Sequence, residues 1–78
     1  MTDMVKHPAH YTKWKIQPRE FAMANNLSFW QGNALKYIMR AGDKQYGGLS
    51  AKESEILDLR KAVETIEDRL RHVEREVM

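Results

Sequence analysis

SAKESEILDLRKAVETIEDRLRHVEREV, residues 50–77, is the stretch that decides the fold of this 78-residue chain. It contains neither proline nor glycine, and it opens with Ser50 followed three residues later by Glu53, the capping-box pattern of a helix start. Its apolar residues are spaced alternately three and four apart, which is the heptad repeat of a coiled coil. The pattern predicts a single helix over 51–77 with an apolar seam of Ile56, Leu59, Val63, Ile66, Leu70, Val73 and Val77.

A helix of this length is too long for the domain that carries it. At about 1.5 Å per residue it extends roughly 40 Å, whereas a compact domain of this size is roughly 30 Å across. We therefore expect the distal seam residues Leu70, Val73 and Val77 to pack against a second copy, which makes the chain a homo-oligomer. The alternative is that this end frays or folds back onto the preceding helices.

Two shorter helices are expected before the long one. Pro18 suits the first turn of a helix over 18–26, and Ser28 with Gln31 forms a second capping box that opens a helix over 29–41. Gly42 follows as a left-handed stop, and residues 1–16 are expected to form an irregular arm. The fold class is therefore all-α: one domain over 1–78 in an oligomeric helical assembly.

Composition narrows the class of protein. The chain has no cysteine, so neither disulfides nor thiolates can stabilise it, and no run approaches the roughly 18 apolar residues of a membrane span. Residues 1–49 contain seven Lys/Arg against three acids and every aromatic residue of the chain, whereas residues 50–78 are net acidic. A basic, aromatic-rich half suits an anionic ligand with flat rings. We expect Phe21, Phe29 and Trp30 to fill the core instead.

One stripe of the helix over 29–41 is a candidate ligand face. A period of 3.6 residues places Asn33, Lys36, Tyr37 and Arg40 together, with Trp30 and other apolar residues on the opposite side. Cations, an amide and a phenol on one stripe could hold a phosphate-bearing ligand. An ordinary solvated face explains the same spacing equally well.

Other candidate motifs are weaker. The segment 7–11, His-Pro-Ala-His-Tyr, could bind a metal or a phosphate through its two imidazoles, or serve as a structural turn. Glu55 and Asp58 complement the helix dipole, or with a second acidic pair could hold Mg²⁺. We predict no metal site and no certain cofactor, with Mg²⁺ required only if the chain is an enzyme. The usual phosphate-cradling loops are absent from the sequence.

Three blocks together resemble a known family: His7-Pro8-x-His10-Tyr11, Gly32-Asn33-Ala34-x-Lys36-Tyr37-Ile38-x-Arg40-Ala41-Gly42 and Asp58-Leu59-x-Lys61-Ala62. They are similar to the small phage-encoded SaV-like family, a domain of unknown function that includes the nucleotide kinase of a T-odd coliphage. The resemblance implies a phage protein acting on nucleotides in the cytoplasm of the infected cell. It implies a pocket of His7, His10, Tyr11, Asn33, Lys36, Tyr37 and Arg40, with Lys61 as an outlying candidate.

The expected function is capture of a phosphorylated nucleotide, which a phage could use to sequester a host nucleotide signal. Lys36 and Arg40 would hold phosphate, Asn33 would donate or accept a hydrogen bond, and Tyr37 or Tyr11 would stack on the base. The alternatives are a small deoxynucleoside monophosphate kinase and a protein that inhibits a host factor through its long helix, so catalytic activity stays open. Single-stranded nucleic acid ranks last among the candidate partners, because a net charge of only +2 is low for that role.

Overall fold

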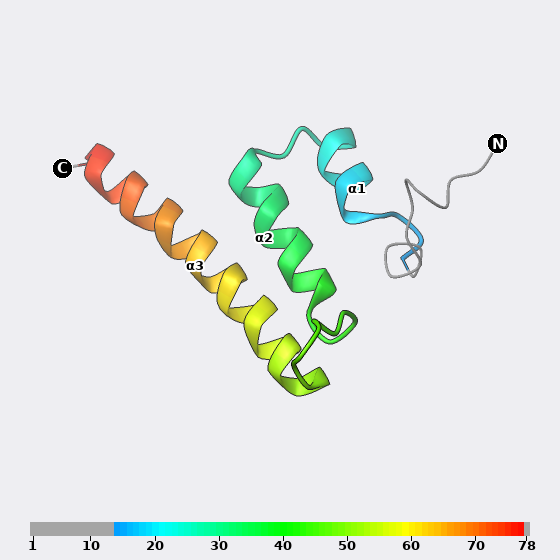
Figure 1. The fold of residues 1–78 in the computed structure, drawn as a ribbon. Coiled ribbons are helices and arrows are strands. Elements are labelled where there is room, and N and C mark those ends of the chain that lie inside the picture. The colour runs from blue at the N-terminus through cyan, green and yellow to red at the C-terminus, as the bar shows by residue number, and fades with distance from the viewer. Residues whose placement is uncertain (1–13, 78) are drawn as a thin grey trace.

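The computed structural model describes residues 14–77, which form three helices and no strand (Figure 1). The helices are α1 (Pro18–Ala24), α2 (Phe29–Arg40) and α3 (Ala51–Val77). Helix α2 lies between the other two, and it runs antiparallel to α3 because residues 41–50 turn the chain back at one end. No helix of this described part is long and apolar enough to cross a membrane. The all-α prediction is confirmed.

The helix boundaries follow the capping residues. The Ser28 hydroxyl accepts from the Gln31 N–H at 3.2 Å, while the Ser28 N–H donates to the Gln31 side chain at 2.9 Å. Ser50 and Glu53 make the same reciprocal pair at the start of α3, at 3.1 and 2.8 Å. Each pair satisfies backbone N–H groups that have no acceptor within the helix. Both predicted capping boxes are confirmed.

The shorter helices end slightly earlier than predicted. Helix α1 ends at Ala24 because Asn25 and Asn26 close it, and Asn26 adopts a left-handed φ of 54°. Helix α2 ends at Arg40, and Gly42 follows with a φ of 88°, as its predicted role as a helix stop requires. The arm predicted over 1–16 is described only from residue 14, and there Trp14–Ile16 is non-helical.

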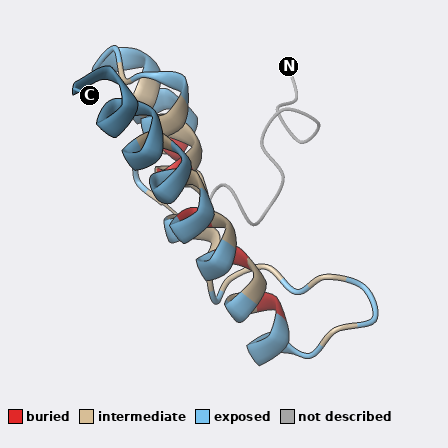
Figure 2. Ribbon diagram, turned by 90° about the vertical axis from the view of Figure 1, so that its left-hand side faces the viewer, coloured by how far each residue is buried: buried red, intermediate tan, exposed pale blue. Residues whose placement is uncertain are grey.

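The contact between α2 and α3 is built from small and polar side chains. Ala34 of α2 and Ala62 of α3 are the buried hydrophobic residues of the described chain, at 6% and 4% exposure. Asp58 and Ser54, respectively one and two turns before Ala62, are fully buried. These residues recur every four positions and form one line on the side of α3 that faces α2 (Figure 2). Small side chains at a crossing allow two helices to approach closely.

The predicted apolar seam lies on a different side of α3 and is exposed. All seven seam residues have exposed fractions between 36% and 82%. Neither α1 nor α2 covers the distal seam residues, and the seam remains a candidate interface. The expectation that Phe21 and Phe29 fill the core is wrong for the single chain, because they are 44% and 84% exposed. Alanines occupy the helix crossing, so no space is left there for aromatic rings.

Candidate functional site

Asp58 is the centre of a polar cluster between α2, α3 and the connecting loop. Its Oδ1 accepts a hydrogen bond from the Tyr46 hydroxyl at 2.5 Å and lies 3.3 Å from both Nε and Nη2 of Arg40. The carboxylate is fully buried and the Arg40 side chain is 12% exposed. Burial removes both charges from water, so each depends on the other for compensation. Oδ2 is buried as well, without a hydrogen-bond partner among residues 14–77.

Cations surround the two tyrosine rings beside this carboxylate. The Arg40 guanidinium carbon lies 5.2 Å from the centre of the Tyr37 ring and 5.7 Å from that of Tyr46. Lys61 Nζ lies close to both rings, 5.6 Å from the centre of Tyr37 and 5.4 Å from that of Tyr46. These distances are within the range of cation–π attraction. Lys61 and Arg40 thus bring α3 and α2 to one site.

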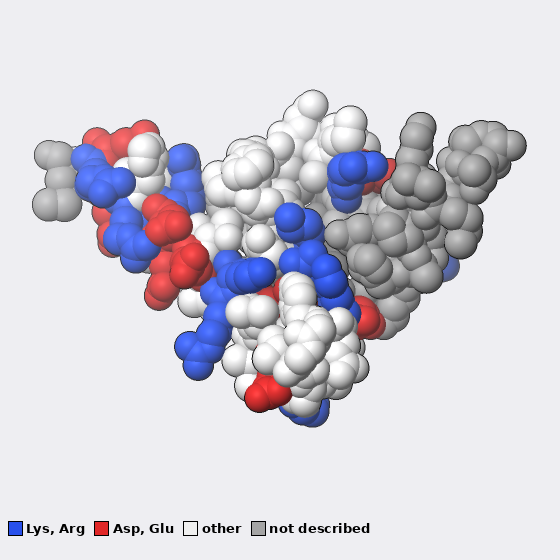
Figure 3. All heavy atoms as spheres, in the orientation of Figure 1, with Lys and Arg blue, Asp and Glu red and all other residues white. Residues whose placement is uncertain are grey.

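Two further lysines complete the group. Lys36 Nζ lies 4.8 Å from the Tyr37 ring centre, and Lys44 Nζ lies 4.9 Å from that of Tyr46. We refer to these residues together as the tyrosine–cation cluster: Lys36, Tyr37, Arg40, Lys44, Tyr46 and Lys61. In Figure 3, Lys and Arg side chains gather over the middle of one face, where α2 and α3 meet. Such a concentration of positive charge attracts anions.

The connecting loop is fixed so that Tyr46 reaches Asp58. The Ser54 hydroxyl accepts from the Tyr46 N–H at 2.9 Å and donates to the Ser50 carbonyl at 2.9 Å. A φ of 82° at Gly48 allows the loop to turn into α3, a conformation that favours glycine. Partial burial and the hydrogen bond to the Asp58 carboxylate raise the pKa of Tyr46 above its usual 10.0. The phenol therefore keeps its proton over the physiological range.

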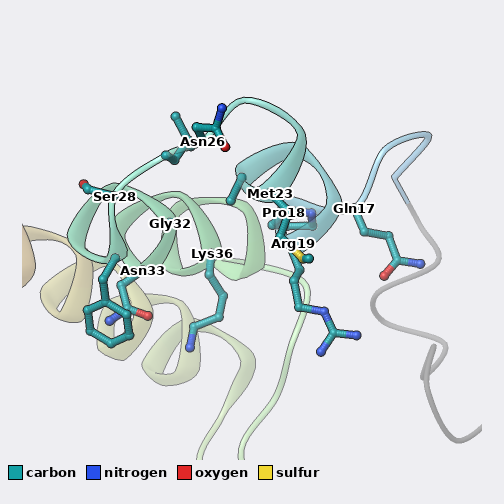
Figure 4. Close-up of a pocket in the computed structure, with 12 residues that line it drawn as sticks. Gln17, Pro18, Arg19, Met23, Asn26, Ser28, Gly32, Asn33 and Lys36 are labelled. Carbon is teal, nitrogen blue, oxygen red and sulfur yellow. The ribbon is translucent and has the colours of Figure 1, made fainter.

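A pocket of ≈ 780 Å³ lies next to the cluster, between α1 and α2 (Figure 4). Its polar lining consists of two cations, three amides and a hydroxyl, and Phe29 contributes an exposed ring. Lys36 and Arg19 extend from facing helices in the same direction. The volume is within the range of small-ligand sites. The polar residues that line it are Gln17, Arg19, Asn26, Ser28, Asn33 and Lys36.

Lys36 belongs to both the pocket and the cluster, so the two form one continuous candidate site. No described acid lies within ion-pair distance of Lys36, Lys44 or Lys61, whereas Arg40 is neutralised by Asp58. The lysines are therefore the charges that an incoming anion would meet. Chemically, the arrangement can hold a phosphate at the lysines and a flat, hydrogen-bonding group in the pocket.

The structure places four of the seven predicted ligand residues together. Lys36, Tyr37 and Arg40 lie in the tyrosine–cation cluster, and Asn33 lines the pocket beside Lys36. Arg40 is largely buried against Asp58, so it differs from the free phosphate ligand that the helical stripe suggested. The other three predicted ligand residues, His7, His10 and Tyr11, lie outside the described residues.

Several site residues were missed or undervalued at the sequence level. Tyr46 and Arg19 were not among the predicted ligands, and Lys61, the outlying candidate, lies inside the cluster. The available signal was the spacing of Ser54, Asp58 and Ala62, because small or polar residues four apart mark a helix face that a neighbouring helix covers closely. No local sequence pattern predicts that a tyrosine of the connecting loop contacts this face of α3.

The acidic pair considered for Mg²⁺ is divided in the structure. Asp58 is buried and bonded to Arg40 and Tyr46, while Glu55 lies 3.6 Å from Lys52 near the surface. A favourable interaction with the helix dipole, the other role considered for this pair, does not account for Asp58 either. Its hydrogen-bond partners lie on α2 and in the connecting loop. Across residues 14–77, no group of three His, Asp or Glu side chains lies close enough to hold a metal ion.

The fold and site define a small helical protein with a basic, tyrosine-lined face. A family model described as a protein of unknown function, DUF3310, matches residues 5–67, and the chain therefore belongs to the DUF3310 family. The match covers α1, α2 and the loop to α3, and it ends within α3 before the distal seam residues Leu70, Val73 and Val77. No curated protein and no solved structure matches the sequence.

Proposed function

We propose that this protein binds a phosphorylated nucleotide, with its phosphate at the tyrosine–cation cluster and its base in the pocket between α1 and α2. The observation that carries the proposal is the placement of three lysines without described acid partners, Lys36, Lys44 and Lys61, around two tyrosine rings beside a pocket of ≈ 780 Å³. The binding event captures the ligand and keeps it from other proteins.

At the phosphate end of the site, the positive charge of the lysines would attract and hold the ligand. Lysine ammonium groups bind phosphate oxygens through charge-assisted hydrogen bonds, and grouping several of them raises the local concentration of anions. The Asp58 carboxylate removes one positive charge by pairing with Arg40 and fixes the position of that side chain. The remaining cations therefore surround a rigid centre, which reduces the entropy lost when a ligand binds.

The base end of the site rests on an exposed ring and on amides. Phe29 is 84% exposed where it lines the pocket, so a planar base has access to its face. Asn26, Asn33 and Gln17 carry both donors and acceptors, as the edges of a nucleobase require. An inorganic anion would use the lysines alone, so the pocket favours a nucleotide over free phosphate.

The phage origin and the choice between a binder and a kinase rest on the resemblance of the three sequence blocks to the SaV-like family. A phage protein that sequesters a host nucleotide signal needs affinity without catalysis. A deoxynucleoside monophosphate kinase would also need a phosphoryl donor and Mg²⁺ held in line with the acceptor. Asp58, an acid of the matching blocks, is occupied by Arg40 and Tyr46, which favours the binder.

The test is mass spectrometry of a panel of linear and cyclic nucleotides incubated with the pure protein, ATP and Mg²⁺. Bound and free fractions are separated, and bound material is released by heat. We expect an unchanged nucleotide in the bound fraction. A new phosphorylated product would replace the binder with the kinase, and a panel that stays entirely in the free fraction would refute nucleotide binding.

A matched pair of lysine variants locates the site. Lys36→Ala removes the charge shared by the pocket and the cluster, and we expect it to weaken binding about tenfold or more, the usual effect of a lost charged hydrogen bond. Lys52→Ala removes an 89% exposed lysine from the first turn of α3, outside the site, and should leave affinity unchanged. Equal losses in the two variants would indicate nonspecific attraction to positive charge.

A further inference from the structure

The apolar seam of α3 points away from the tyrosine–cation cluster. Lys61 lies two residues from both Leu59 and Val63, which at 3.6 residues per turn is roughly 200° around the helix. The cluster and the seam therefore occupy opposite sides of α3. A partner that covers the seam leaves the proposed ligand site open.

The exposed apolar surface extends from α3 onto α2. Ala34 faces α3 across the helix crossing, and Tyr37 lies on the side of this contact that carries Lys61. One turn after Ala34, Ile38 lies on the other flank, and it is 52% exposed. Because Lys61 lies on the Tyr37 flank and the seam lies on the opposite side of α3, the flank that carries Ile38 is the one on which the seam lies. Ile38 thus widens the seam into a two-helix apolar face.

The charges that flank the seam are arranged for a parallel partner. In a coiled coil, the alternating apolar seam positions are called a and d. In a parallel pair, the residue just before an a position of one helix faces the residue just after the next d position of the partner, whose number is higher by five. With Ile56 and Leu70 at a positions, Glu55 faces Arg60 of the second copy, and Arg69 faces Glu74. Both pairs join opposite charges, and no like charges meet at these positions.

Antiparallel alignments of the same seam bring like charges together. When Ile56 is placed opposite Val73 of the second copy, Glu55 faces Glu76, although Arg60 also faces Glu67. Sliding one helix by a heptad, so that Val63 lies opposite Val73, brings Glu67 and Arg69 each against its own copy. Arg60 then faces Glu74. Like charges opposite each other destabilise a helix pair. These antiparallel alignments thus combine attractive and repulsive pairs, whereas every charged pair at these positions in the parallel, in-register arrangement is attractive.

We propose that two copies of this chain associate through a parallel, in-register pairing of their α3 helices along the seam from Ile56 to Val77, with Ile38 at its margin. The second copy covers side chains that are 36–82% exposed in one chain. Since α2 occupies one flank of each α3, the seam has room for one further helix. The two ligand sites then face outward on opposite sides of the dimer.

Disulfide trapping tests the orientation, because the chain has no cysteine of its own. In the proposed dimer the two copies of Val77 meet, so Val77→Cys should form a disulfide-linked dimer under mild oxidation. In an antiparallel dimer the two positions lie on the order of 30 Å apart and cannot join. The control is Glu64→Cys, an exposed position away from the seam, which should remain monomeric on a denaturing gel.

A charge swap tests the register of the two α3 helices and whether a second copy of the chain covers the seam. Sedimentation equilibrium of the unmodified chain should show a monomer–dimer equilibrium. Glu74→Arg places a second guanidinium opposite Arg69 and should raise the dimer dissociation constant about tenfold, whereas Arg69→Glu added to it should return the constant to within about twofold. A monomer at all concentrations, a trimer or larger assembly, or a double variant no better than Glu74→Arg would each overturn the proposal. Circular dichroism confirms that every variant keeps its helices.

Discussion

Replacing Asp58 with alanine is the perturbation that the structure makes most consequential. The carboxylate is fully buried and accepts from both Arg40 and Tyr46, so its removal leaves a guanidinium at 12% exposure without that partner. Breaking a buried ion pair from one side costs about 3–5 kcal/mol, and the lost acceptor for the Tyr46 hydroxyl adds about 1 kcal/mol. A domain of this size has a total stability of about 4–12 kcal/mol. Asp58→Ala should therefore be close to unfolding at 25 °C.

The measurement is urea unfolding followed by circular dichroism at one fixed protein concentration, because self-association would add to the apparent stability. The matched control is Asp68→Ala. Asp68 pairs with Arg71 on the same helix, but both side chains are more than half exposed, and such surface pairs contribute about 0–1 kcal/mol. We expect the midpoint to fall sharply for Asp58→Ala and hardly at all for Asp68→Ala.

A double substitution distinguishes the effect of breaking the ion pair from the effect of losing packing at Asp58. Arg40→Met combined with Asp58→Leu removes both buried charges at once, and replacing a buried pair by apolar residues is often close to neutral. The double variant should therefore be more stable than Asp58→Ala by about 2 kcal/mol or more. The reasoning is refuted if Asp58→Ala costs no more than Asp68→Ala, or if the double variant is the least stable of the set.

Three further predictions concern the loop and its caps. Tyr46 has a raised pKa, so its contribution to stability is complete below pH 10.0 and is lost as the pH rises through the higher folded-state pKa. In Tyr46→Phe, the free energy of unfolding should therefore fall less steeply with pH across the alkaline range. Gly42→Ala should lower the free energy of unfolding in urea by about 1 kcal/mol. The cause is backbone strain at a φ of 88°, because the nearest atom to an added Cβ, in Glu55, is 3.8 Å away and does not clash. Ser50→Ala should cost about 1 kcal/mol, and it should move the NMR titration midpoint of Glu53 upward toward 4.5, because the Ser50 N–H and hydroxyl both lower the pKa of this carboxyl. An unchanged midpoint would show that the hydroxyl has no part in the shift.

The helices were predictable because their signals are local. Capping at Ser28 and Ser50 depends on a side chain three residues away, and the stop at Gly42 depends on its own backbone. The stripe of Lys36, Tyr37 and Arg40 was predictable for the same reason, since residues three and four apart share a helix face. Each of these interactions is complete within one or two turns of chain.

The sequence by itself therefore determined the helices, their ends, the basic stripe and an apolar seam too long for one small domain. The tertiary structure decided that the face of α3 with Ser54, Asp58 and Ala62, and not the apolar seam, meets α2. The larger apolar residues stayed outside because Ala34 and Ala62 allow the helices to approach closely, and Asp58 is compensated in that contact by Arg40 and Tyr46. Those partners lie 18 and 12 residues away along the chain. A buried charge is tolerated only where distant groups converge on it, and that convergence is a property of the folded chain.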